Sequence, residues 1–184
     1  MSIALILIDI QNDYFKNGKC ELFQSEKSAE NAKKILLFFR KNNLPIIHVQ
    51  HISIDKTASF FVPHTYGSEI NETVFPLDNE HIIIKHTPDS FFQTDLQNLL
   101  DKKHITELVI CGMMSHMCID TSVRTAKKFG YNITLINDAC TTKNLFWDGI
   151  EIQASTVHQV FMASLQKSFA DIKNTDTFLS SCYK

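Results

Sequence analysis

The residues best suited to chemistry in this chain are a cysteine, an aspartate and a lysine, each at or just past the end of an apolar run. Cys118 follows the run from Thr106 to Cys111 after a short irregular link, and it opens a stretch with the periodicity of an amphipathic helix. Unpaired N–H groups and the helix dipole at such a start stabilise a thiolate. Cys118 is therefore the candidate nucleophile, and the alternative is a small buried hydrophobe.

Asp9 directly follows the first apolar run, IALILI. An acid at this position is costly to bury without a partner, so it either caps a loop or works in a site. Another reading makes Asp9 itself a nucleophile, as in aspartyl-phosphate hydrolases. That chemistry calls for a second acid two residues later, and Gln11 stands there instead. The aspartate-nucleophile reading is weakened accordingly.

Lys85 ends the run HIIIK, whose three consecutive isoleucines indicate a central strand. Lysines usually point to solvent, which is the plain alternative, but from a central strand the ammonium would emerge into a crevice. In open parallel sheets, ligands bind at the carboxyl ends of the strands, where Asp9, Lys85 and Cys118 would meet. A thiol nucleophile needs a base and a positive group, and these residues provide both.

The elements that must position these residues alternate along the chain. Continuous apolar strands separated by helices predict a parallel sheet covered on both faces, hence one three-layer α/β/α domain over residues 1–184. The expected strands are IALILI, PIIHV, HIIIK, ELVICG, NITLIN and FADI. The expected helices span Ser25 to Asn43, Thr94 to Lys103, Cys118 to Phe129 and Asp148 to Lys167, the last opened by Trp147.

The segment from Gln50 to Glu80 has no sustained periodicity. Long irregular segments in compact domains are usually functional lids or disordered chain. Its aromatic residues favour an ordered lid. The candidates for the wall of a substrate pocket are Phe15, Phe60, Phe61, Tyr66 and His116, with ordinary core packing as the alternative for at least half of the aromatic residues.

Composition narrows the class of protein. The chain has 184 residues, with Lys+Arg 18 against Asp+Glu 20, and no long basic tract, so neither nucleic acid nor a lipid surface is an expected partner. The apolar N-terminus is interrupted by Asp9 too early for a signal peptide or a membrane span. Five cysteines without a C-x-x-C pair argue against a disulfide framework and a structural zinc site, and they favour the cytoplasm.

Three blocks of the sequence resemble the isochorismatase-like cysteine hydrolase superfamily. They are DIQND, the Lys85 strand followed by PDSFFQTDLQNLL, and GMMSHMCIDTSVRTAKKFGYNITLINDACTT. The last block is specific to this superfamily. The first two blocks are weak signals separately, and they support the resemblance because they occur in the expected order along the chain. The resemblance runs from Ile3 to about Thr175, which is nearly the whole chain.

The resemblance implies a doubly wound fold with a six-stranded sheet, a homodimer or larger assembly, and a triad of Asp9, Lys85 and Cys118. It also implies an oxyanion hole made by the backbone N–H groups of Met114 and Cys118, with a cis peptide bond at Met113–Met114. Members with a cysteine nucleophile generally hydrolyse C–N bonds of amides, ureides or carbamoyl groups through a thioester, and Cys118 argues against isochorismate as substrate. No cofactor is implied.

Histidines leave two alternatives open. His48, His51, His64, His81 and His86 lie close together in the sequence, and a zinc or iron site needs about three convergent ligands. Nicotinamidase relatives carry a D-x-H motif here, but this chain reads VQHIS, with Gln50 in place of the aspartate, so the sequence predicts no metal site. His116 is a second candidate partner for the thiol, ranked below Asp9 as a residue of the pocket wall.

The leading hypothesis is therefore a metal-independent cysteine hydrolase that acts on a C–N bond of a small molecule. A metal-dependent amidase resembling the nicotinamidases is one alternative. A binding or thiol-sensing protein that keeps the fold without turnover is the other. The sequence does not identify the substrate.

Overall fold

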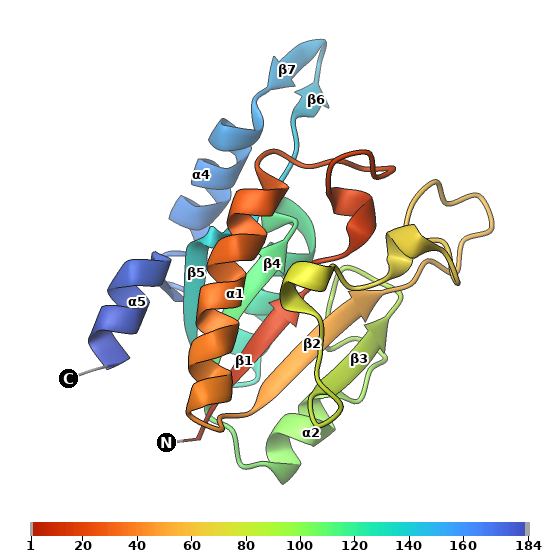
Figure 1. Cartoon of the computed structure of the whole chain (residues 1–184). Coiled ribbons are helices and arrows are strands. Elements are labelled where there is room, and N and C mark those ends of the chain that lie inside the picture. Colours follow the sequence, from red (N-terminus) through yellow and green to blue (C-terminus); the bar gives the residue numbers. More distant parts are fainter. Residues whose placement is uncertain (1, 183–184) are drawn as a thin grey trace.

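The computed structural model describes residues 2–182 and contains a six-stranded, all-parallel sheet in the order β3-β2-β1-β4-β5-β8 (Figure 1). This confirms the predicted parallel sheet, in which β1 and β4 occupy the centre. The run HIIIK, which was expected to be a central strand, is instead the edge strand β3, and its Ile82 and Ile84 are exposed. The strands are β1 Ile3–Ile8, β2 Ile46–His51, β3 His81–Lys85, β4 Glu107–Met113, β5 Asn132–Thr141 and β8 Asp171–Lys173.

Helices cover the sheet as the apolar spacing requires. The helices are α1 Ser25–Lys41, α2 Leu96–Lys102, α3 Asp120–Lys128, α4 Ala154–Leu165 and α5 Thr175–Cys182. Helix α1 crosses the front of the sheet in Figure 1, and its face Ala29, Ala32, Ile35, Leu36 and Phe39 is fully buried. Helix α5 packs beside α1, whereas α3 and α4 contact each other and β5. None of the helices within residues 2–182 is long and apolar enough to cross a bilayer.

The start predicted for the last helix, at Asp148, is wrong. Residues Leu145–Trp147 (β6) and Ile150–Ile152 (β7) form an antiparallel hairpin that projects from the rest of the molecule (Figure 1), and α4 begins only at Ala154. Asp148 and Gly149 form the turn with φ of 49° and 74°. Two central residues with positive φ suit the right-handed twist of a hairpin, and Asp-Gly is a favoured pair for this turn. Trp147 therefore lies on an exposed strand.

The helix expected from Cys118 also begins differently. A single π-helical turn, η4 Ser115–Ile119, precedes α3, which starts at Asp120. Cys118 lies inside this turn, one residue before its end. Such turns appear mostly inside or next to α-helices and frequently at functional sites. The thiol therefore sits at the junction between β4 and α3.

Gly112 allows β4 to approach β1 closely, just before the link to Cys118. Its φ is 130°, and a Cβ atom there would lie 2.0 Å from the carbonyl oxygen of Ile8. We expect Gly112→Ala to lower the free energy of unfolding by about 3 kcal/mol, because it adds a clash to backbone strain. Gly130→Ala is the matched control, since Gly130 also has a positive φ but open space around it. Urea denaturation of both variants checks the prediction, and equal losses would contradict it.

The segment expected to act as a lid is ordered and is tied to the first strand. Strand β2 continues to His51, so the irregular part begins two residues later than predicted. It contains two short 3₁₀ turns, η2 Tyr66–Ser68 and η3 Glu72–Val74. The carboxylate of Asp13 accepts a hydrogen bond of 2.7 Å from the Phe61 N–H. The segment therefore rests on the residues that directly follow the Asp9 strand.

Glu80, the last residue of this segment, anchors the segment to the rest of the domain through hydrogen bonds. Its carboxylate accepts hydrogen bonds from Arg40 Nε at 2.7 Å, His48 Nε2 at 2.8 Å and the Leu77 N–H at 3.0 Å. Burial raises the pKa of Glu80, but the hydrogen bonds from Arg40, Leu77 and His48 outweigh it and lower the pKa to about 2. Glu80 thus joins α1, β2 and the end of the irregular segment.

This lowered pKa predicts an acid-dependent stability. A carboxyl group whose pKa falls on folding stabilises the protein fully above its unfolded value of 4.5, and the stabilisation is lost as the pH falls toward about 2. We expect Glu80→Gln to be less stable than the parent protein above pH 4.5 and to lose less stability on acidification. Chemical denaturation across this range measures both, and parallel curves for the two proteins would contradict the assignment.

Candidate active site

Asp9, Lys85 and Cys118 meet at the carboxyl edge of the sheet. Lys85 Nζ lies 2.7 Å from Asp9 Oδ2 and 3.2 Å from Cys118 Sγ. The three residues come from the end of β1, the end of β3 and the π turn after β4. The structure therefore brings together the three residues that the sequence placed at strand ends.

The length of the lysine side chain is needed for this arrangement. Strand β2 lies between β1 and β3, so Lys85 starts two strands away from Asp9. Neighbouring strands are about 4.8 Å apart, so two spacings amount to about 9.6 Å, which the long lysine stem and the aspartate side chain span together. Gly112 keeps β4 close to β1 on the other side, which holds the turn that carries Cys118 near the same point.

The cluster is almost completely removed from solvent. Asp9 and Lys85 are 0% exposed and Cys118 is 3% exposed. Burial and the charge of Asp9 raise the pKa of the Cys118 thiol, and Lys85 opposes them. Burial lowers the pKa of Lys85, but the charges of Asp9 and Cys118 outweigh it, so the pKa is raised and the side chain is an ammonium. The resting site thus holds a protonated thiol beside an ion pair.

Asp9 is arranged to take up a proton. It adopts a left-handed conformation with φ of 53°, which aspartate tolerates better than most residues, and its N–H donates to Val49 O at 2.9 Å. Both carboxylate oxygens are buried; Oδ2 is paired with the Lys85 ammonium at 2.7 Å, whereas Oδ1 has no hydrogen-bond partner among residues 2–182. Lone pairs of Asp9 are therefore available to the thiol proton.

His51 is the residue of this cluster that the sequence interpretation missed as part of the catalytic constellation. Its Nδ1 lies 3.1 Å from Lys85 Nζ, and one oxygen of Asp9, one nitrogen of His51 and the sulfur of Cys118 lie within 4.8 Å of one another. Because β2 continues to His51 and pairs it with Lys85 in register, both side chains reach the same place. The sequence interpretation ended this strand with its apolar run PIIHV, whereas β2 extends two residues further, to His51.

These three side chains are also the one group of metal-ligating residues that converges among residues 2–182. Lys85 Nζ already lies between them, at 2.7 Å from Asp9, 3.1 Å from His51 and 3.2 Å from Cys118. An ammonium at that point repels a cation and fills its position. The donor set therefore fits the lysine and not a metal ion.

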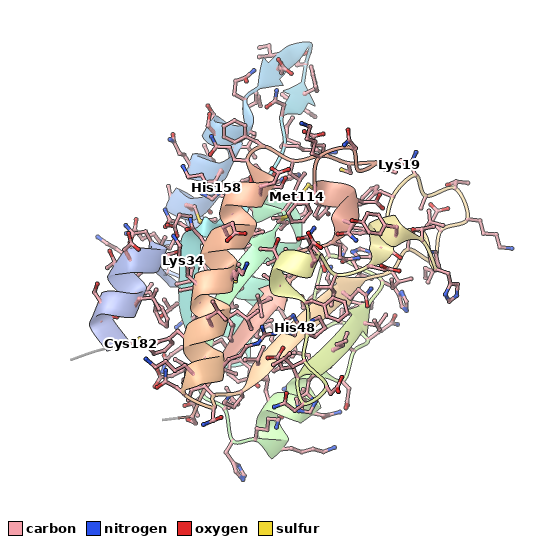
Figure 2. The ribbon with its side chains drawn as sticks, in the orientation of Figure 1. Lys19, Lys34, His48, Met114, His158 and Cys182 are labelled. Carbon is pink, nitrogen blue, oxygen red and sulfur yellow. The ribbon has the colours of Figure 1, made fainter. Side chains whose placement is uncertain are left out.

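The other histidines are used elsewhere. His48 is buried against Glu80, and Figure 2 shows it lower in the sheet than Met114. His86 Nδ1 contacts Ile52 O at 2.7 Å, while His64 and His81 are exposed. They do not converge with His51. His116 is paired through Nδ1 with the Thr142 hydroxyl, and its ring packs on Phe161, so this nitrogen is not directed to the thiol.

Of the residues considered for a pocket wall, Phe61 lies nearest the cluster. Its buried ring is 5.6 Å from that of His51 and 4.9 Å from that of Phe60. Phe15 and Tyr66 line a hollow of about 410 Å³. Asp9, Lys85 and Cys118 are not among the residues that line it. The structure thus places Phe61, and Phe60 through it, beside the cluster but gives Phe15 and Tyr66 other surroundings.

The link before Cys118 has the backbone form that the resemblance implied. The Met113–Met114 peptide bond is cis, and Met114 precedes the π turn in an extended conformation. Figure 2 shows Met114 toward the carboxyl ends of the strands. Among the remaining cysteines, Cys111 and Cys140 are buried in the strands β4 and β5, and Cys182 is exposed on α5.

The fold and the cluster together define a doubly wound α/β protein with an aspartate, a lysine and a thiol at the carboxyl edge of its sheet. Residues 3–177 match the family model of the isochorismatase domain, so the chain belongs to the isochorismatase family and is a hydrolase of that family.

Three relatives illustrate this membership. The chain is 50% identical over 179 residues to the uncharacterized isochorismatase family protein YddQ of Bacillus subtilis, across 97% of this chain and 99% of that protein. It is 40% identical to a crystal structure described as an isochorismatase hydrolase from Oleispira antarctica, with a TM-score of 0.94 and coverage of 97% and 96%. It is also 30% identical over 142 residues to streptothricin hydrolase of Streptomyces noursei, across 77% of this chain and 50% of that protein.

Proposed function

We propose that this protein hydrolyses a C–N bond of a small amide, ureide or carbamoyl compound, with Cys118 as nucleophile and a thioester intermediate. The observation that carries the proposal is the position of Lys85 Nζ, 2.7 Å from Asp9 Oδ2 and 3.2 Å from Cys118 Sγ. Forming a thiolate in a buried site requires a base that accepts the thiol proton and a cation that stabilises the negative sulfur.

The first step moves one proton and forms one bond. Asp9 takes the proton of the Cys118 thiol, and the Lys85 ammonium stabilises the thiolate that remains. The thiolate attacks the substrate carbonyl, and the C=O electron pair moves to the oxygen. The backbone N–H groups of Met114 and Cys118 donate to this oxyanion, a contribution that commonly amounts to about 3 kcal/mol for one donor.

The second step releases the amine and restores the thiol. Asp9 returns its proton to the nitrogen, the C–N bond breaks, and the acyl group stays on Cys118 as a thioester. Asp9 is then a carboxylate again and can accept a proton from the attacking water. Hydrolysis of the thioester releases the acid, and the proton held by Asp9 returns to the sulfur. Neither step consumes an oxidant or a second substrate other than water.

The streptothricin hydrolase relative supports a hydrolytic function, since its name describes hydrolysis of streptothricin. The test is release of ammonia or amine across a panel of amides, ureides and carbamoyl compounds, followed by a colorimetric or chromatographic assay. Turnover of at least one member by the parent protein supports the proposal. Cleavage that proceeds only for esters or other C–O bonds would contradict it.

The arrangement also predicts that the activity does not depend on metal. Because the Lys85 ammonium occupies the centre of the group Asp9, His51 and Cys118, we expect chelators to leave the rate unchanged. Added Zn²⁺ should inhibit if it has any effect, because binding to the thiolate requires displacement of the ammonium. The rate before and after dialysis against EDTA, with metal analysis of the purified protein, checks this. Loss of activity that Zn²⁺ or Fe²⁺ restores would favour the metal-dependent amidase instead.

A further inference from the structure

Strand β3 forms one edge of the sheet, and among residues 2–182 it pairs with β2 alone (Figure 1). An edge strand exposes backbone N–H and C=O groups that can pair with another chain, and proteins usually protect such an edge with charged side chains or proline. Strand β3 has the sequence HIIIK, and its lysine, Lys85, is buried in the catalytic cluster. Neither a proline nor an exposed Lys, Arg, Asp or Glu therefore lies on β3.

The backbone groups of Ile82 and Ile84 point toward this free edge. The Ile52 N–H donates to Lys85 O at 3.0 Å, so the backbone of Lys85 points toward β2. Because successive residues of a strand turn their N–H and C=O groups to opposite sides, the groups of Ile82 and Ile84 point away from β2. No strand or bridge within residues 2–182 pairs with β3 on that side. The edge thus offers two N–H donors and two C=O acceptors.

The same two isoleucines expose apolar side chains on one face of the sheet. Ile82 and Ile84 are 47% and 44% exposed, whereas Ile83 between them is 9% exposed. Ile82 is the neighbour of His48 in the β2–β3 register, and His48 contacts Glu80, which is hydrogen-bonded to α1. Since neighbouring side chains in register share a face, the exposed isoleucines lie on the face of the sheet that α1 covers.

Two further apolar residues lie beside them on this face. Phe75 is 61% exposed and accepts a hydrogen bond of 2.7 Å from Arg40 of α1 at its carbonyl, and Leu77 is 52% exposed. The edge strip, defined as Phe75, Leu77, Ile82 and Ile84, exposes roughly 400 Å² of apolar surface. A two-fold axis would cover the strip of both copies. Together with the paired backbones, this buries about 1,000 Å², near the lower limit for a specific interface.

We propose that β3 pairs antiparallel with β3 of a second copy of this chain, across a two-fold axis at Ile83. In this register Ile82 of each copy lies opposite Ile84 of the other, and each such pair exchanges two backbone hydrogen bonds. All four outward groups of each copy are then satisfied, and the isoleucines of each pair meet on one face.

A second copy fits this edge because the edge is complementary to itself. In the proposed register every free donor meets a free acceptor, and each exposed isoleucine meets another. The modest area predicts a weak dimer with a dissociation constant in the micromolar range.

Sedimentation velocity of the full chain across micromolar concentrations tests this pairing without a substrate. Ile84→Lys places a cation against Ile82 of the second copy. Ile54→Lys is the matched control, since Ile54 is 73% exposed but lies outside β3. We expect the parent protein to dimerise as its concentration rises. The dissociation constant should increase at least about tenfold in the Ile84 variant and stay unchanged in the control.

Hydrogen exchange locates the interface. The amides of Ile82 and Ile84 have no acceptor within residues 2–182, so we expect them to exchange rapidly in the monomer and to gain protection in the dimer. A protein that stays monomeric at every concentration, or a dimer equally stable in Ile84→Lys, would overturn the proposal.

If the lysine variant does not fold, hydrogen exchange of the parent protein decides. Protection of these two amides that increases with concentration supports the pairing, and its absence overturns it. None of these measurements depends on turnover, so they are independent of the proposed function.

Discussion

Replacing Cys118 with alanine is expected to lower hydrolysis by at least about 10³-fold, because no other group in the cluster can form the acyl intermediate. The variant should fold, since it removes only one buried sulfur atom and leaves the Asp9–Lys85 ion pair intact. Initial rates on any substrate that the parent protein accepts, together with thermal unfolding of both proteins, measure the two effects.

Cys140→Ala is the matched control for this substitution. Cys140 is also buried, at 4% exposure, but it lies in β5 and, within residues 2–182, it forms no hydrogen bond or ion pair with Asp9 or Lys85. We expect it to keep most of its activity despite a similar loss of sulfur from the core. Activity retained in Cys118→Ala, or lost equally in both variants, would exclude Cys118 as the nucleophile.

Replacing Lys85 with methionine is expected to reduce both activity and stability. Methionine preserves much of the length and apolar surface of the lysine stem, but it removes the charge that holds the Asp9 carboxylate and the thiolate. Breaking one partner of a buried ion pair commonly costs about 3–5 kcal/mol, because the other charge stays buried without compensation. We expect a loss of this size in the free energy of unfolding at pH 7, and hydrolysis lower by about 10³-fold.

A double variant separates the ion pair from packing. Asp9→Asn with Lys85→Met removes both charges, so its loss of stability should be smaller than the sum of the two single losses. Urea denaturation of the four proteins completes the cycle. Strictly additive losses would show that Asp9 and Lys85 do not interact in solution, and the assignment of Lys85 as the cation of the site would then be untenable.

The sequence predicted the central part of the fold well for a physical reason. Strands buried on both faces are continuous apolar runs, so IALILI marks β1 without help from the rest of the chain. The run HIIIK also marked a strand, but its isoleucines misled about position, because β3 pairs on one side only and exposes Ile82 and Ile84. Polar residues that end such runs must meet at one edge of a parallel sheet. Asp9 and Lys85 could therefore be placed in one site before any contact was known.

Residues whose position depends on tertiary contacts were harder to predict. His51 lies beyond the last fully apolar residue of its strand, and only the pairing of β2 with β3 shows that it shares a place with Lys85. At the hairpin, the Asp148–Gly149 pair was a usable local signal for a turn, but the helical spacing of the following residues obscured it. The π turn around Cys118 has no distinctive sequence pattern.

The central claim is that Cys118 carries the acyl group during turnover, and the mass of the acid-quenched protein tests it most directly. A substrate found in the amide panel is mixed with the parent protein, quenched at short times and digested for peptide mapping. The account predicts a mass increase equal to the acyl part of the substrate, located on the peptide that contains Cys118. An acyl group located on any other residue would contradict it.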